Sequence, residues 1–106
     1  MIPIKFSPSF PCYSMLANDC TNPYVMTADG NLALVVVTSE DRLKKLRSQG
    51  VSAGPSIRFD LPENLALYLS SLPTNVKKVA FDPEDNGKAI VVDAGEFYKK
   101  LLERAQ

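Results

Sequence analysis

The chain has 106 residues, with 12 lysines and arginines balanced by 12 aspartates and glutamates, and therefore a formal net charge of zero. A chain of this length forms one domain that buries roughly two-thirds of its unfolded surface without needing a metal or a disulfide. The zero net charge provides no long-range attraction for nucleic acid, an anionic membrane or an acidic substrate, so we expect none of these partners.

Histidine is absent, and the only cysteines are Cys12 and Cys20. The lack of histidine removes the commonest general base, the Ser-His and Cys-His nucleophile pairs and most transition-metal sites. Two cysteines are too few for a disulfide framework or a zinc tetrahedron, so we expect reduced thiols rather than a redox pair. No apolar stretch approaches the roughly 18 residues of a membrane span, and the first residues lack the apolar core of a secretory signal. The sequence therefore predicts a cytoplasmic protein with no cofactor.

Residues 1–22 contain three prolines among serines and aromatic residues. Proline favours extended or turning backbone over helix, so this segment is predicted to be an arm or an edge strand. Its apolar anchors are Phe6, Phe10 and Tyr13. They either tie the arm onto the domain or, as exposed aromatics, dock a partner or a second copy of the chain.

The longest apolar run, residues 32–37, is rich in valine. It predicts a strand that is covered on both faces. Residues 24–28 form the strand before it, joined through the hairpin turn Asp29-Gly30. Residues 56–59 alternate in polarity and predict a short strand, and residues 76–81 and 88–92 predict a second hairpin.

Three helices each follow a strand. The first begins at Thr38 or Ser39, has acidic residues in its first turn and ends at Gly50. Its basic residues are interpreted as a solvated face and not as a nucleic-acid site. The last helix is predicted to begin after Asp93, which forms a capping box with Glu96. Together these elements predict an α+β fold with a mixed, largely antiparallel sheet of about five strands and three helices packed on it.

The second helix is apolar around more of its circumference than a surface helix requires. Asp60 is predicted to cap it, with Pro62 in its first turn and Pro73 at its end. Its inward stripe comprises Leu61, Leu65, Tyr68, Leu69 and Leu72. Leu67 falls outside this stripe, so we expect either the N-terminal arm or another chain to cover it.

The connection before the last strand has the ligand spacing of a calcium loop. The matching positions are Asp82, Glu84, Asn86, Gly87 and Asp93. Pro83 stiffens this loop, the ninth position is Ile90 and the flanking segments are strands instead of helices. We therefore interpret it as a hairpin loop with acidic turn residues and assign no metal site.

No residue is assigned a catalytic role, because nearly all the aspartates occupy turns or helix starts, where they cap the backbone. Asp60 and Asp82 both follow strands. They are the candidates if the domain binds or hydrolyses a small molecule.

Two stretches carry a resemblance to a known family. Residues 37–43 read Val-Thr-Ser-Glu-Asp-Arg-Leu at the end of a strand, and a leucine-rich helix over residues 65–72 leads into a valine strand that ends in Phe81-Asp82-Pro83. These stretches resemble the N-terminal domain of the SseB (enhanced serine sensitivity) family of bacterial proteins, with valine at position 37 replacing an aromatic residue and Asp82 replacing asparagine. The resemblance covers about residues 24–102. It implies an α+β domain and brings no catalytic residues.

The sequence predicts a non-enzymatic cytoplasmic module that acts through a protein partner or by self-association. Its candidate contact residues are Phe6, Phe10 and Leu67. The alternative is a small-molecule-binding or hydrolytic domain that uses the carboxylates at strand ends. A contact module should present an apolar patch or a symmetric interface, whereas an enzyme should present a pocket with convergent polar groups.

Overall fold

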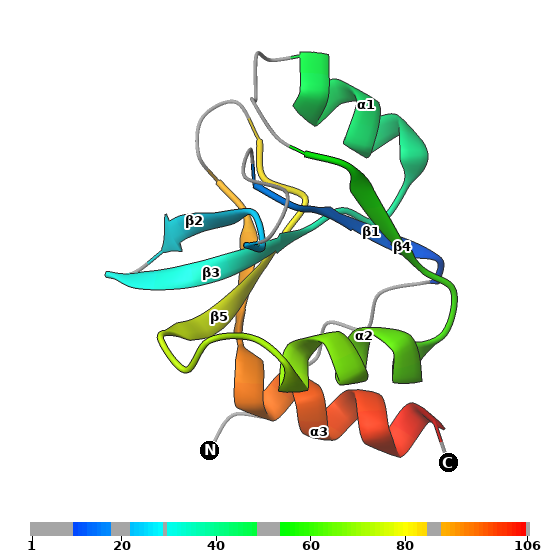
Figure 1. The fold of residues 1–106 in the computed structure, drawn as a ribbon, viewed down its shortest axis with the longest axis vertical. Helices are drawn as coiled ribbons and strands as arrows, with labels where there is room; N and C mark the ends of the chain where they lie inside the picture. The colour runs from blue at the N-terminus through cyan, green and yellow to red at the C-terminus, as the bar shows by residue number, and fades with distance from the viewer. Residues whose placement is uncertain (1–9, 18–21, 29, 49–53, 85–87, 106) are drawn as a thin grey trace.

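The structure is a computed structural model that describes residues 10–17, 22–28, 30–48, 54–84 and 88–105. The elements in chain order are β1 (Cys12–Met15), β2 (Val25–Ala28), β3 (Asn31–Val36), α1 (Glu40–Ser48), β4 (Ser56–Phe59), α2 (Pro62–Ser70), β5 (Val76–Phe81), β6 (Ile90–Asp93) and α3 (Ala94–Ala105). Figure 1 shows α1 at one end of the molecule, α2 and α3 together at the other, and the strands between them. None of the helices described in this structure is long and apolar enough to cross a membrane.

The strands form two sheets, where the sequence predicted a single sheet of about five strands. Four strands pair in the order β2-β3-β5-β6, and β1 pairs with β4 in a separate two-stranded sheet. The β2–β3 and β5–β6 hairpins are antiparallel, as predicted. The β3–β5 pair is parallel, because the chain makes a long crossover through α1, β4 and α2 between these strands. The α+β class is therefore confirmed, and the division into two sheets corrects the predicted layout.

β3 is one of the two central strands of the larger sheet and is covered on both faces, as its valine-rich sequence predicts. Leu34 and Val36 pack into a core with side chains of α2 and α3, including Leu65 and Phe97. Val35, on the other face, packs into a second core against Leu46 of α1 and residues of β1. The alternation of side chains along the strand thus serves two cores, one on each side of the sheet.

β1 lies inside the segment that the sequence left open as an arm or an edge strand. All four of its residues are buried, and β1 pairs with β4 from Cys12↔Phe59 to Met15↔Ser56. Tyr13 also exchanges two backbone hydrogen bonds of 2.8 Å with Val37, directly after β3. The described part of this segment is therefore a structural strand that contributes to both cores; residues 1–9, including Phe6, lie outside the described residues.

The helix starts agree with the sequence in two cases out of three. Ser39 Oγ accepts the Arg42 N–H at 3.2 Å at the start of α1, and Asp93 Oδ2 accepts the Glu96 N–H at 3.0 Å at the start of α3. Asp60 does not cap α2: Leu61 is its extended N-cap residue (φ −130°, ψ 153°). The Leu61 N–H donates to Asn64 Oδ1 at 3.0 Å.

The inward face of α2 agrees with the predicted stripe except at Leu61: Tyr68 and Leu72 are partly buried against the core that contains Leu65 and Leu69. Leu65, Ala66 and Leu69 are the buried residues of this helix. Leu61, which was expected to point inward, is 51% exposed because it precedes the helix in an extended conformation. The helix is therefore anchored by its second and third turns and not by Leu61.

Candidate functional site

The parallel pairing of β3 and β5 brings the carboxyl ends of these strands together. Val36 lies opposite Phe81 at the end of the ladder. The chain then leaves β3 through Thr38 and leaves β5 through Asp82. Polar groups that follow neighbouring parallel strands meet at one edge of a sheet, where α/β proteins often bind ligands.

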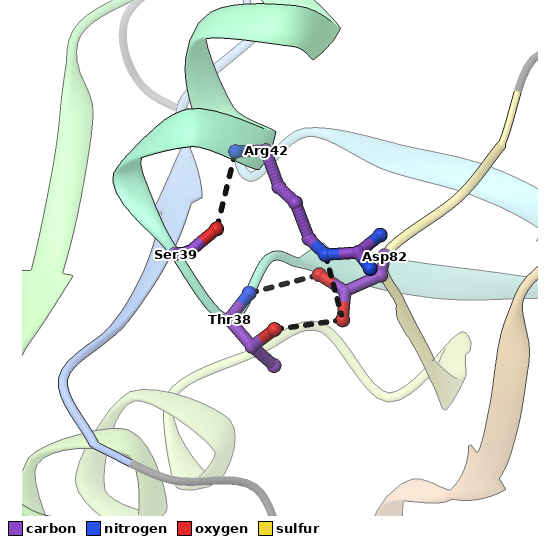
Figure 2. Close-up of polar contacts among 4 residues, drawn as sticks. All are labelled: Thr38, Ser39, Arg42 and Asp82. Carbon is purple, nitrogen blue, oxygen red and sulfur yellow. Dashed lines mark hydrogen bonds and ion pairs between the residues drawn. The ribbon is translucent and has the colours of Figure 1, made fainter.

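Thr38 and Asp82 are joined by two hydrogen bonds at this edge. The Thr38 backbone N–H donates to Asp82 Oδ1 at 2.9 Å, and the Thr38 hydroxyl donates to Oδ2 at 2.8 Å (Figure 2). The Asp82 N–H in turn donates to the Val36 carbonyl at 2.9 Å. Both oxygens of this carboxylate thus hold the loop that leads from β3 into α1.

Asp82 adopts a left-handed backbone conformation, with a φ of 51°. This region is unfavourable for side chains with a Cβ, although aspartate tolerates it better than most. The two hydrogen bonds from Thr38 and the one to Val36, the last residue of β3, hold Asp82 in this conformation. Strained backbone of this kind is found preferentially at binding and active sites.

Arg42, the third residue of α1, completes the cluster. Its Nε lies 3.9 Å from Asp82 Oδ2 (Figure 2). The arginine side chain is 55% exposed and the aspartate side chain 14% exposed. The contact therefore places a solvent-facing guanidinium beside a fixed, largely covered carboxylate.

Two cavities adjoin residues of this cluster. The first has a volume of about 390 Å³ and is lined by Phe10, Pro11, Tyr13, Thr38, Ser39, Glu40 and Asp41. The second has a volume of about 320 Å³ and is lined by Arg42, Phe81, Asp82, Glu84, Lys88, Ala89 and Ile90. Both volumes lie at the lower end of the range for small-molecule sites.

The buried thiol of Cys12 is poorly suited to nucleophilic chemistry. Burial raises its pKa from 9.0 to about 11, and the negative charge of Asp82 adds to this rise while Arg104 opposes it. A thiol with this pKa stays protonated at neutral pH, and the thiolate is the reactive form. Cys20 lies outside the described residues.

The two carboxylates singled out from the sequence occupy different environments. Asp82 belongs to the cluster described above and lines the second cavity. Asp60 instead forms an exposed ion pair with Arg58, with 2.6 Å between its Oδ1 and Arg58 Nε. Asp60 lines neither of the two cavities. The two aspartates are therefore not combined in either cavity as an acid–base pair would require.

The ends of the calcium-like loop are occupied by other contacts. The carboxylate of Asp82 binds Thr38, and that of Asp93 caps α3. The Glu84 N–H donates to the Lys88 carbonyl at 2.8 Å, which closes the connection between β5 and β6. Asn86 and Gly87 lie outside the described residues. Within the part of the chain that the structure describes, no group of three or more acidic, histidine or cysteine residues could hold a metal ion.

The candidate partner-contact residues that the structure describes, Phe10 and Leu67, differ in how far they are buried. Phe10 is partly buried against the core of α2 and α3, and the Arg104 guanidinium carbon lies 5.1 Å from the centre of its ring. This ring therefore ties the segment before β1 to α3. Leu67 is 73% exposed in the middle of α2, so none of the described residues before β1 covers it.

Comparison with known proteins finds no family model that matches this chain and no curated protein that matches it significantly.

Proposed function

We propose that this domain is a non-enzymatic, cytoplasmic protein-contact module, resembling the SseB N-terminal domain, and that it associates with a second copy of itself through the outer surface of α2. The observation that carries the proposal is the 73% exposure of Leu67. Burying an exposed leucine near the centre of a short helix in an interface stabilises the association by up to about 2 kcal/mol.

The other exposed apolar residues support the same surface. Among the described residues, the large exposed apolar side chains are Leu61, Leu67, Ile90 and Leu102. Three of these four belong to α2 and α3 or precede α2 directly, and these two helices pack together as one layer (Figure 1). Exposed apolar side chains on neighbouring helices are the material from which a protein contact site can be built.

The charge of the chain favours a second copy as the partner. Because the formal net charge is zero, two copies have no net monopole repulsion to overcome. A twofold interface would place the same surface of each copy against the other, so each exposed leucine would be used twice.

The chemistry of the described groups supports a role without catalysis. The sequence has no histidine, and the Cys12 thiol is held protonated by burial. The Asp82 carboxylate accepts two hydrogen bonds from Thr38, which makes it a structural acceptor more than a general base.

Sedimentation velocity over micromolar to millimolar protein tests this proposal. We expect the weight-average sedimentation coefficient of the wild type to rise with concentration, and Leu67→Glu to remain monomeric. Thr27→Glu, on the exposed face of β2, adds the same charge elsewhere and should associate like the wild type. All three should melt alike, because Leu67 contributes little to the core. A wild type that stays monomeric throughout, or a Leu67→Glu variant that associates normally, would overturn the proposal.

A further inference from the structure

The second cavity, beside the Thr38, Asp82 and Arg42 cluster, has the features of a built site for a small anion. We propose that it binds a short aliphatic monocarboxylate, with Arg42 and Lys88 holding the carboxylate and Ala89 and Ile90 contacting its apolar body. All four residues line this cavity of about 320 Å³. The site is separate from the α2 surface, so the inference does not depend on self-association.

The guanidinium of Arg42 lies beside a fixed carboxylate before any ligand arrives. Its Nε faces Asp82 Oδ2 at 3.9 Å, and both oxygens of that carboxylate are fixed by Thr38. Ser39 caps the backbone of the same arginine. A guanidinium that approaches an internal carboxylate through Nε can direct its terminal nitrogens to a second carboxylate, which they match with two parallel hydrogen bonds. This ion pair restrains the guanidinium and so reduces the entropy that the arginine side chain loses when a ligand binds.

The charges around the cavity favour a ligand with a single negative charge. Arg42 and Lys88 supply two cations, and Asp82 and Glu84 supply two anions. Arg42 faces Asp82 and partly offsets its charge, whereas the exposed Glu84 carboxylate repels negative charge on the ligand, and a dianion twice as strongly as a monoanion. The lining therefore accommodates a monoanion better than a dicarboxylate or a phosphate.

The apolar lining defines the rest of the ligand. Ile90 is exposed at the start of the edge strand β6, and Ala89 precedes it. An aliphatic chain of a few carbons lying on these residues would cover Ile90 without a polar group to satisfy. The left-handed backbone of Asp82 at the same cavity is consistent with a ligand-binding role, because such conformations gather at ligand sites.

A nuclear magnetic resonance titration at constant ionic strength tests this site, with sodium butyrate as the probe. We expect saturable shifts of the amide signals of Arg42, Ala89 and Ile90, with a dissociation constant in the millimolar range. Butyramide has nearly the same shape without the charge, and it should produce no saturable shift. Succinate, a dianion, should bind at least tenfold more weakly than butyrate.

N-acetylvaline distinguishes the two sources of such a carboxylate. It carries the carboxylate of a peptide C-terminus, so binding tighter than that of butyrate would assign the site to chain ends, and weaker binding would assign it to free short-chain acids. Either result supports a carboxylate site.

Variants decide whether the named side chains form the site. Arg42→Gln should weaken butyrate binding at least tenfold and Lys88→Gln by a smaller factor, whereas Lys44→Gln, an exposed charge on the same helix, should bind like the wild type. Leu67→Glu should also bind normally, which separates this site from the proposed association. Equal shifts with butyrate and butyramide, or unchanged binding by Arg42→Gln, would overturn the inference.

Discussion

Asp82 accepts both the backbone N–H and the hydroxyl of Thr38, at 2.9 and 2.8 Å, although 44 positions separate the two residues. These bonds connect the end of β5 to the chain between β3 and α1. They make Asp82 the residue on which the geometry of this edge of the sheet depends.

Replacing Asp82 should reveal both its side-chain and its backbone roles. Asp82→Ala should lower the free energy of unfolding by about 2–3 kcal/mol, because it removes two charge-assisted hydrogen bonds and leaves the Thr38 N–H without its acceptor. Asp82→Gly removes the same bonds but relieves the φ of 51°, so it should lose about 1 kcal/mol less than alanine. Asp82→Asn keeps one acceptor oxygen, so its free energy of unfolding should decrease the least of the three. Urea unfolding measures all three, and an alanine variant as stable as the wild type would contradict this account.

Val36 tests the central position of β3. Its side chain is fully buried between the sheet and the α2–α3 layer. Val36→Asp should therefore place an unpaired charge in the core and cost about 3–5 kcal/mol or prevent folding altogether. Thr27→Asp, on an exposed position of β2, should change the free energy of unfolding by less than about 1 kcal/mol. Thermal melting compares the two, and similar melting temperatures would show that β3 is not central.

The Cys12 thiol should make the protein less stable in alkali. Its pKa is raised to about 11 in the native state from an ordinary value of 9.0, so the unfolded chain releases this proton first. The contribution is complete below about pH 9 and falls as the pH rises towards 11. By about pH 10 the free energy of unfolding should have decreased by about 1 kcal/mol.

The control for this effect is Cys12→Ala. Its free energy of unfolding is compared at each pH with that of the protein that retains Cys12, and both proteins carry Cys20→Ser. Burial also raises the pKa of Tyr68, but this contribution is common to both proteins and cancels in the difference. The stabilities of the two proteins should change in parallel below about pH 9, and above it the protein with Cys12 should lose stability faster, so that its advantage over Cys12→Ala shrinks. A difference that stays constant with pH would show that the thiol titrates normally.

Divalent metals should leave the melting temperature unchanged. The first and twelfth positions of the calcium-like loop, Asp82 and Asp93, already accept hydrogen bonds from Thr38 and from the start of α3. A metal that bound the native state would raise the melting temperature by mass action. Millimolar calcium, magnesium or zinc should give the same melting curve as a chelator. A calcium-dependent increase that disappears in Asp93→Asn would contradict this account and show that the loop binds calcium.

Most of the elements after residue 22 could be predicted from the sequence, because their signals are local. The turn before β3 contains Gly30, whose φ is 77°, and the starts of α1 and α3 carry side chains that cap them as expected. The valine run of β3 indicates burial on both faces without reference to any partner. Such features depend on residues within one turn or one strand of each other.

The arrangement of the elements depended on distant pairings that local patterns do not contain. Nothing within β3 or β5 specifies that they lie side by side and parallel, so the contact between Thr38 and Asp82 could not be predicted. Asp60 and Asp82 looked alike as residues after strands. They differ because β4 pairs with β1 in the other sheet.

β1 was indistinct in the sequence because a polar residue lies in the middle of it. Ser14 is buried, and its hydroxyl donates to the Val35 carbonyl at 2.6 Å. A hydroxyl that finds a backbone acceptor can occupy a core, yet in the sequence it interrupts the apolar pattern that indicates a buried strand.

The pairing of β1 with β4 also has a consequence for synthesis on the ribosome. β1 leaves the exit tunnel before any strand that covers it, and its ladder partner Phe59 is translated in the second half of the chain. At a translation rate of about 5–20 residues per second, β4 is synthesised roughly 2–9 seconds after β1, and the apolar residues of β1 lack this partner until then. The β2–β3 hairpin can form during this interval and offers Val37 as a first contact for Tyr13. Slower translation between residues 40 and 56 would prolong the exposure of β1 and favour its capture by chaperones or by other nascent chains.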